Sequence, residues 1–127
     1  MDSDKLPKRT YQDLIVWQKS IDLVKDCYGL TETFPQREIY GLSQQLRRAA
    51  VSIPSNIAEG NGRESRKDYI HFLNISRGSL KEVETQLIIS EKLGFIQKIQ
   101  LADILKKTEE IGRMLNGLIR SLRKFIP

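Results

Sequence analysis

The sequence is poor in the residues that build chemical sites, with one cysteine and one histidine among 127 residues. Cys27 has no partner for an internal disulfide. Asp68 and His71 have the spacing of one half of a di-iron site, but such a site needs a second histidine from the same chain. The single histidine also excludes most triads for acid–base or nucleophilic catalysis. We therefore predict no enzymatic activity, no metal, no cofactor and no small-molecule substrate.

Long apolar runs are missing as well. No stretch approaches the roughly 20 apolar residues needed to cross a bilayer. The opening residues Met1-Asp2-Ser3-Asp4-Lys5 lack the apolar segment of a secretory signal. These absences predict a cytoplasmic protein with no membrane partner.

Proline and glycine are sparse, with four and eight residues, and they gather at a few points. Between these points, apolar residues recur at alternating spacings of three and four, which places them on one face of a helix. Ser65 followed by Asp68 predicts a helix start, and Gly94 a helix end. The pattern predicts four helices over about 12–31, 40–59, 66–93 and 98–125. Because the connections are short, we expect one all-α domain over 1–127, an antiparallel up-down-up-down four-helix bundle.

Each predicted helix has one apolar stripe that we assign to the core. Over 12–31 the stripe consists of Leu14, Trp17, Ile21, Val24 and Tyr28. The other three stripes run over residues 42–57, 69–87 and 101–122. Pro54 lies within the second of the four helices, where it leaves a backbone carbonyl without its donor and should bend the helix.

Two helices carry a second apolar stripe, which the core does not use up. On 12–31 and 66–93 these stripes comprise Val16, Leu23, Cys27 and Leu30, and Ile75, Gly78, Ile89 and Leu93. Monomers rarely expose contiguous patches of this kind. The two helices are diagonal in the expected bundle, so their outer apolar surfaces would point to opposite sides of the molecule. Two unlike apolar surfaces on opposite sides would join copies head to tail. The prediction is a cyclic homo-oligomer; the alternative is that both stripes are wide core faces.

The net charge is +5, with 21 basic and 16 acidic residues. Antiparallel order brings the turn near residue 62 to the same end as both termini, where Lys5, Lys8 and Arg9 would also gather. A basic pole of this kind could hold the phosphates of RNA or DNA; the alternative is an ordinary solvated end, with cations that complement the dipole of the last helix. The candidate nucleic-acid residues are Arg47, Arg48, Arg63, Arg66, Lys67, Arg120, Arg123 and Lys124.

The stretch from Tyr40 to Gly60, YGLSQQLRRAAVSIPSNIAEG, is the most distinctive part of the chain. It resembles the four-helix bundle proteins encoded in intervening sequences of bacterial 23S ribosomal RNA genes. Further similarity lies in Tyr11-Gln12-Asp13-Leu14, in Gly78-Ser79-Leu80 and over 112–118. The resemblance covers nearly the whole chain.

The resemblance implies an all-helical bundle and, for related members, a pentameric barrel. One related branch is the basic accessory protein of diversity-generating retroelements, which works with a reverse transcriptase and nucleic acid. The family has no established catalytic residues. Two interpretations stay open: a non-catalytic, ring-forming scaffold that binds RNA or DNA through its basic pole, or an oligomeric protein-interaction module with no nucleic-acid role.

Overall fold

The structure, a computed structural model, describes residues 10–126, and over this range it is all helical, as predicted. Two short 3₁₀ helices, η1 (Tyr11–Asp13) and η2 (Gln36–Glu38), precede the first two α-helices. The α-helices are α1 (Ile15–Thr31), α2 (Leu42–Asn61), α3 (Arg66–Lys92) and α4 (Lys98–Arg123). The predicted bounds are therefore correct to within about two or three residues, the usual uncertainty of helix ends.

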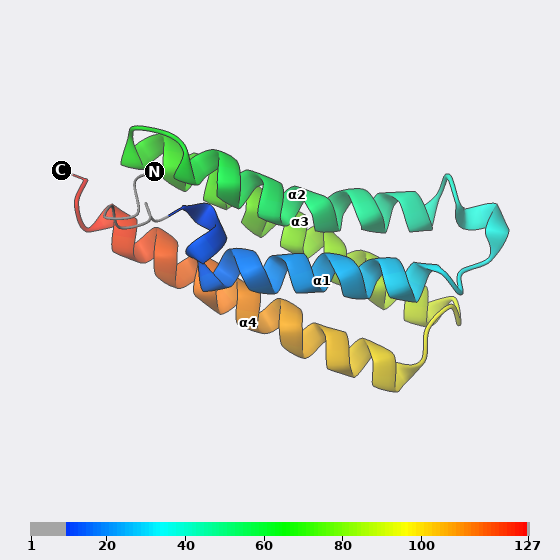
Figure 1. Cartoon of the computed structure of the whole chain (residues 1–127). Helices are drawn as coiled ribbons and strands as arrows, with labels where there is room; N and C mark the ends of the chain where they lie inside the picture. The colour runs from blue at the N-terminus through cyan, green and yellow to red at the C-terminus, as the bar shows by residue number, and fades with distance from the viewer. Residues whose placement is uncertain (1–9, 127) are drawn as a thin grey trace, which may run out of the picture.

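Successive helices run in opposite directions (Figure 1). The start of α1, the α2–α3 turn and the end of α4 lie at one end of the bundle, and the other two connections lie at the opposite end. Helix α1 packs against α2 and α4, and α3 packs against the same two helices. Helices α1 and α3 are therefore diagonal, as the sequence predicted.

Helix α3 begins and ends at the predicted signals. The hydroxyl of Ser65 accepts a hydrogen bond from the backbone N–H of Asp68 at 3.0 Å, which caps the first turn. Gly94 follows the helix with a φ of 79°, a conformation that glycine adopts without strain. The N–H of Phe95 then donates to the carbonyl of Ser90 at 2.8 Å, which satisfies one of the last carbonyls.

Helices α2 and α3 pack most closely, because small residues line their contact. A Cβ built on Gly60 would lie 2.9 Å from the Cβ of Phe72. The hydroxyl of Ser76 donates to the carbonyl of Ile53 at 2.8 Å, and this bond ties the two helices together at mid-length.

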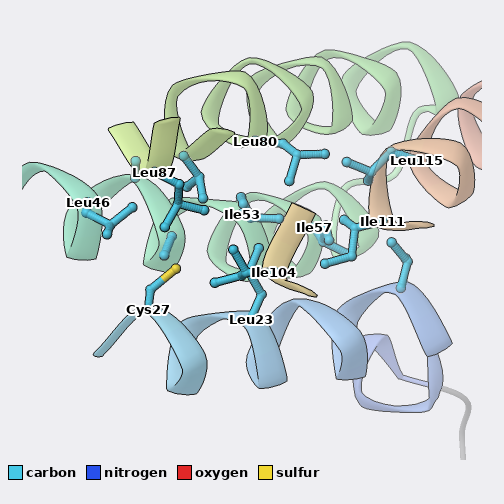
Figure 2. Close-up of a cluster of buried hydrophobic side chains, with 14 of the residues drawn as sticks. Leu23, Cys27, Leu46, Ile53, Ile57, Leu80, Leu87, Ile104, Ile111 and Leu115 are labelled. Carbon is cyan, nitrogen blue, oxygen red and sulfur yellow. The ribbon is translucent and has the colours of Figure 1, made fainter. Parts of the chain in front are cut away.

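The core is apolar and draws on all four helices (Figure 2). The predicted stripes of α2, α3 and α4 supply most of it, with Leu46, Ile53, Leu80 and Leu115 almost fully enclosed. Polar residues also enter the core: Thr108 of α4 is buried and its hydroxyl donates to a carboxylate oxygen of Glu84 at 2.9 Å. None of the four α-helices, within residues 10–126, has the long apolar sequence that a membrane crossing requires.

The core assignment for α1 was wrong. Leu23 and Cys27, predicted to face outward, point into the core, where neither is exposed to solvent (Figure 2). Trp17 and Val24 are only half-buried, and Tyr28 is exposed. The inward face of α1 includes the polar residues Ser20 and Thr31, whose hydroxyls donate to backbone carbonyls one turn back. Because these hydroxyls are satisfied locally, they enter the core at little cost.

Candidate interaction surfaces

The eight residues predicted to form an oligomer interface divide into two groups. Val16, Leu23 and Cys27 are buried inside the protomer, so they cannot contact another molecule, and Leu30 is half-buried beside the core. The α3 residues are exposed instead. Ile75, Gly78, Ile89 and Leu93 all face solvent.

Five exposed residues lie on one side of α3 and its C-terminal end, and we call them the α3 stripe: Ile75, Gly78, Glu82, Ile89 and Leu93. Their spacings of three, four and seven keep them on one side of the helix. Ile75, Ile89 and Leu93 are 38%, 42% and 57% exposed. A Cβ built on Gly78 would have no neighbour within 4 Å, so the stripe has a notch open to solvent at this position.

A groove between α1 and α2 is the second apolar surface. One end is an open hollow of about 280 Å³. At the other end it widens to about 530 Å³, and Val51 lines both parts. We call the whole feature the α1/α2 groove. Its walls are Tyr11, Trp17, Ile21, Val24, Tyr28, Ile39, Tyr40, Gln44, Arg47, Arg48, Val51, Ser52, Pro54, Ser55 and Ala58.

Sequence reasoning missed this groove because it assigned the outward α1 residues to the core. Trp17 packs edge-on against Tyr11, with ring centroids 5.2 Å apart, so the narrow end has an aromatic wall. Tyr40 at the wide end is 88% exposed, and Val51, which lines both ends, is 39% exposed. These values decide that the groove is an outer surface, because core side chains of this size are enclosed.

Arg47 and Arg48 lie at the wide end of the groove, not at the basic pole. The Nε of Arg47 donates to the hydroxyl of Thr31 at 2.8 Å, and its guanidinium lies 4.6 Å from the ring centroid of Tyr28. Arg47 therefore joins α2 to α1. Arg48 is exposed. Arg63 lies sixteen residues after Arg47, just beyond the end of α2, which corresponds to about 24 Å at the rise of a helix. The prediction that all the basic residues gather at one end was therefore wrong for Arg47 and Arg48.

The other six basic candidates do lie at one end of the bundle. The guanidinium of Arg66 lies 4.3 Å from the ring centroid of Phe125, which brings the start of α3 to the end of α4. Arg63 is partly neutralised, because it forms an ion pair with Glu59 at 2.6 Å. Lys67, Arg120, Arg123 and Lys124 are exposed. Lys5, Lys8 and Arg9, expected at the same pole, lie outside the described residues.

Cys27 and Glu110 are among the titratable groups whose pKa the fold shifts. Burial, helped by the charge of Asp26, raises the pKa of the Cys27 thiol to about 12, so the thiol stays protonated at neutral pH. Between α1 and α4, Lys19 and Glu110 form an ion pair at 2.7 Å, and its hydrogen bond lowers the pKa of the Glu110 carboxyl. Within residues 10–126 no group of three or more His, Cys, Asp or Glu side chains is placed to hold a metal ion.

Four helices around one core, an exposed α3 stripe and a groove between α1 and α2 define a small helical-bundle protein with two unlike apolar surfaces. A family model described as 23S rRNA-intervening sequence protein matches residues 12–117. The chain belongs to this family, as the Tyr40–Gly60 stretch indicated.

The fold is also similar to a solved structure. It is the crystal structure of a protein of unknown function from the S23 ribosomal protein family of Bacteroides thetaiotaomicron VPI-5482. The two are 27% identical, with a TM-score of 0.75 over 83% of this chain and 98% of the other. No curated protein matches the chain.

Proposed function

We propose that this protein is a non-catalytic scaffold that assembles head to tail into a closed ring. The observation that carries the proposal is the presence of two unlike apolar surfaces, the α3 stripe and the α1/α2 groove, on different sides of one protomer. Apolar side chains that gather on the solvent-exposed surface are typical of interaction sites. The family resemblance implies five copies for the ring.

The arrangement of the two surfaces favours a ring over a two-fold dimer. A two-fold contact pairs one patch with itself, so it would leave the other patch of each copy exposed. A head-to-tail contact places the stripe of one copy in the groove of the next, and closure covers both surfaces on every copy. The diagonal arrangement of α1 and α3 keeps the two surfaces apart, so one copy can bind two neighbours.

Mixing two assembly-deficient variants tests this proposal. The stripe variant is Ile75→Glu/Ile89→Glu, and the groove variant is Val51→Glu/Ser55→Glu; all four positions are exposed, so both variants should fold. Native mass spectrometry should show wild-type rings and monomers of each variant. The equimolar mixture should form heterodimers and nothing larger, because one intact stripe meets one intact groove.

The control is Ile99→Glu, which places one glutamate at an exposed apolar residue of α4, and it should assemble as the wild type does. A monomeric wild type would overturn the proposal. Rings formed by either variant alone, or a mixture that stays monomeric while the wild type assembles, would show that the contact is not head to tail.

A second role, binding of RNA or DNA, is favoured by the basic pole. Six cationic side chains lie at this end, and no acidic residue follows Glu110 in the sequence. Contacts to phosphates depend mainly on cations of this kind. A ring with the helices along its axis would bring the poles of all copies to one rim, and the multiplied contacts would raise the avidity. Without this role, the protein would be an oligomeric interaction module only.

Neutralising the end of α4 separates the two roles. We expect single-stranded RNA or DNA to bind the wild type with an affinity that falls steeply with salt. The variant Arg120→Gln/Arg123→Gln/Lys124→Gln should bind more weakly, with a log–log salt slope reduced by about 2 for three lost phosphate contacts. Fluorescence anisotropy at several salt concentrations measures both quantities.

The control removes the same charge from exposed lysines away from this end: Lys25, Lys98 and Lys106. This control should keep most of the affinity. An equal loss in both variants would contradict a specific role of the pole. No binding by the wild type would leave the interaction module as the function.

A further inference from the structure

We infer that neighbouring copies in the ring lie side by side with parallel helices and no shift along the bundle axis, so that Arg48 of one copy pairs with Glu82 of the next. This inference rests on the proposed head-to-tail assembly. It adds the register of the contact and the residues that fix it.

Contacts between α2 and α3 show which residues lie level along the bundle. The hydroxyls of Ser52 and Ser79 are 2.8 Å apart, so these two residues are level. Because the helices are antiparallel, moving three residues forward from Ser79 to Glu82 corresponds to moving back on α2 to the turn that contains Arg48. Glu82 and Arg48 therefore lie within one turn of the same level, although they belong to different surfaces.

The same correspondence applies to the apolar residues. Ile75, next to Ser76, is level with Pro54, because Ser76 contacts the carbonyl of Ile53. Gly78 is level with Val51, and Ile89 with Tyr40 and the start of α2. The stripe presents, in order, a bulky residue, a notch, an acid and a bulky residue. At the same levels the groove presents a hollow, the partly exposed Val51, a cation and an apolar end.

Rotation about an axis parallel to the helices keeps every copy at the same height. Levels that match within one protomer therefore match between neighbours in such a ring. The exposed side chain of Val51 then fits the notch at Gly78. If neighbouring copies docked with antiparallel helices, the order of the stripe residues along the groove would be reversed. Pairing Glu82 with Arg48 would then place the notch at Gly78 away from Val51.

The two surfaces carry charges of opposite sign that form no ion pair within residues 10–126. Both Arg48 and Glu82 are exposed, and neither forms an ion pair with another residue of 10–126. Arg47 beside Arg48 is already held by Thr31, so Arg48 is the cation available to a neighbour. Paired charges in an interface chiefly fix its register and exclude wrong partners.

Charge reversal tests the pairing. The single variants Arg48→Glu and Glu82→Arg should each raise the protomer concentration needed for assembly by about tenfold or more, since each places two like charges together. The double variant Arg48→Glu/Glu82→Arg should assemble as the wild type does. Lys106→Glu, an exposed reversal on α4, is the control and should have no effect. Sedimentation velocity over a concentration series measures all four.

Disulfide trapping tests the register independently of charge. Val51→Cys/Gly78→Cys should form disulfides between neighbours under mild oxidation, and a non-reducing gel should show a ladder that stops at the ring size. Cys27 does not interfere because it is fully buried. Val51→Cys/Lys106→Cys is the control and should stay unlinked.

The possible failures are distinct. If the wild type is monomeric, the proposed assembly itself is overturned. If the wild type assembles but the double reversal does not, or both cysteine pairs cross-link equally, the register is overturned and head-to-tail assembly stands. Cross-linking by Val51→Cys alone would place two grooves face to face, which also overturns the register.

Discussion

The close approach of α2 and α3 at Gly60 makes a quantitative prediction. An alanine Cβ at this position would lie 2.9 Å from the Cβ of Phe72 and 3.1 Å from the carbonyl oxygen of Tyr69. Both atoms belong to, or are attached directly to, the backbone of α3, so rotation of a side chain cannot relieve the contact. The helices must move apart, and overpacking of this kind costs about 1–3 kcal/mol.

An opposing effect reduces this cost. Alanine is a better helix former than glycine by up to about 1 kcal/mol, and by less near the end of a helix, where Gly60 lies. We therefore expect Gly60→Ala to lower the free energy of unfolding by about 1–2 kcal/mol. For a domain of this size, that corresponds to a melting temperature lower by several degrees.

Urea unfolding followed by circular dichroism measures the change, at one fixed protomer concentration because assembly adds to apparent stability. Gly117→Ala is the matched control, since a Cβ there would meet nothing within 4 Å. It should leave stability unchanged or raise it. If Gly60→Ala is as stable as Gly117→Ala, the close packing of α2 on α3 is refuted.

Three further predictions concern α1 and its charges. Leu23→Ala should destabilise the fold by about 2–5 kcal/mol and Val24→Ala by clearly less in chemical denaturation, because only Leu23 is fully buried; equal losses would contradict the observed orientation of α1. The Cys27 thiol should resist iodoacetamide in the folded protein, and its raised pKa should make stability fall as pH rises from 9 toward about 12, an effect that Cys27→Ala should reduce. The pKa of the Glu110 carboxyl is lowered in the folded protein, so the Glu110–Lys19 ion pair stabilises the fold at neutral pH, and this stabilisation is lost as the pH falls through that lowered pKa. In unfolding titrations, the free energy of unfolding of Glu110→Gln should therefore fall less steeply with decreasing pH than that of the wild type.

Periodicity predicted the helices and most of the core. The predicted core stripes of α2, α3 and α4 lie mostly on the inward faces. Helix α3 also carries a second apolar stripe, but its residues Ile75 and Ile89 are exposed, as predicted. Helix α1 was different, because Trp17 and Leu23 belong to two stripes of similar regularity. The inward stripe also includes Ser20, which a search for apolar residues does not count. The choice between the stripes depends on packing against α2 and α4, which the sequence of α1 does not contain.

The same error hid the groove. Once Trp17 and Val24 are assigned to the core, α1 no longer supplies an apolar wall for a surface between α1 and α2. The basic pole was easier to predict for Arg66 and Arg123, because antiparallel order alone brings the ends of α3 and α4 together. Arg48 was wrongly assigned to the pole because the prediction grouped it with the other basic residues of α2 and the turn after it. Its distance from that turn along the helix was not taken into account.

Native mass spectrometry of the wild-type protein tests the central claim most directly. Two unlike apolar surfaces on one protomer predict one dominant closed species whose mass is a fixed multiple of 14.7 kDa, with a multiple of five if the ring size implied by the family resemblance applies. A single peak at 14.7 kDa at the highest concentrations used would contradict the account. A continuous series of oligomers of increasing length, with no dominant species, would contradict closure into a ring.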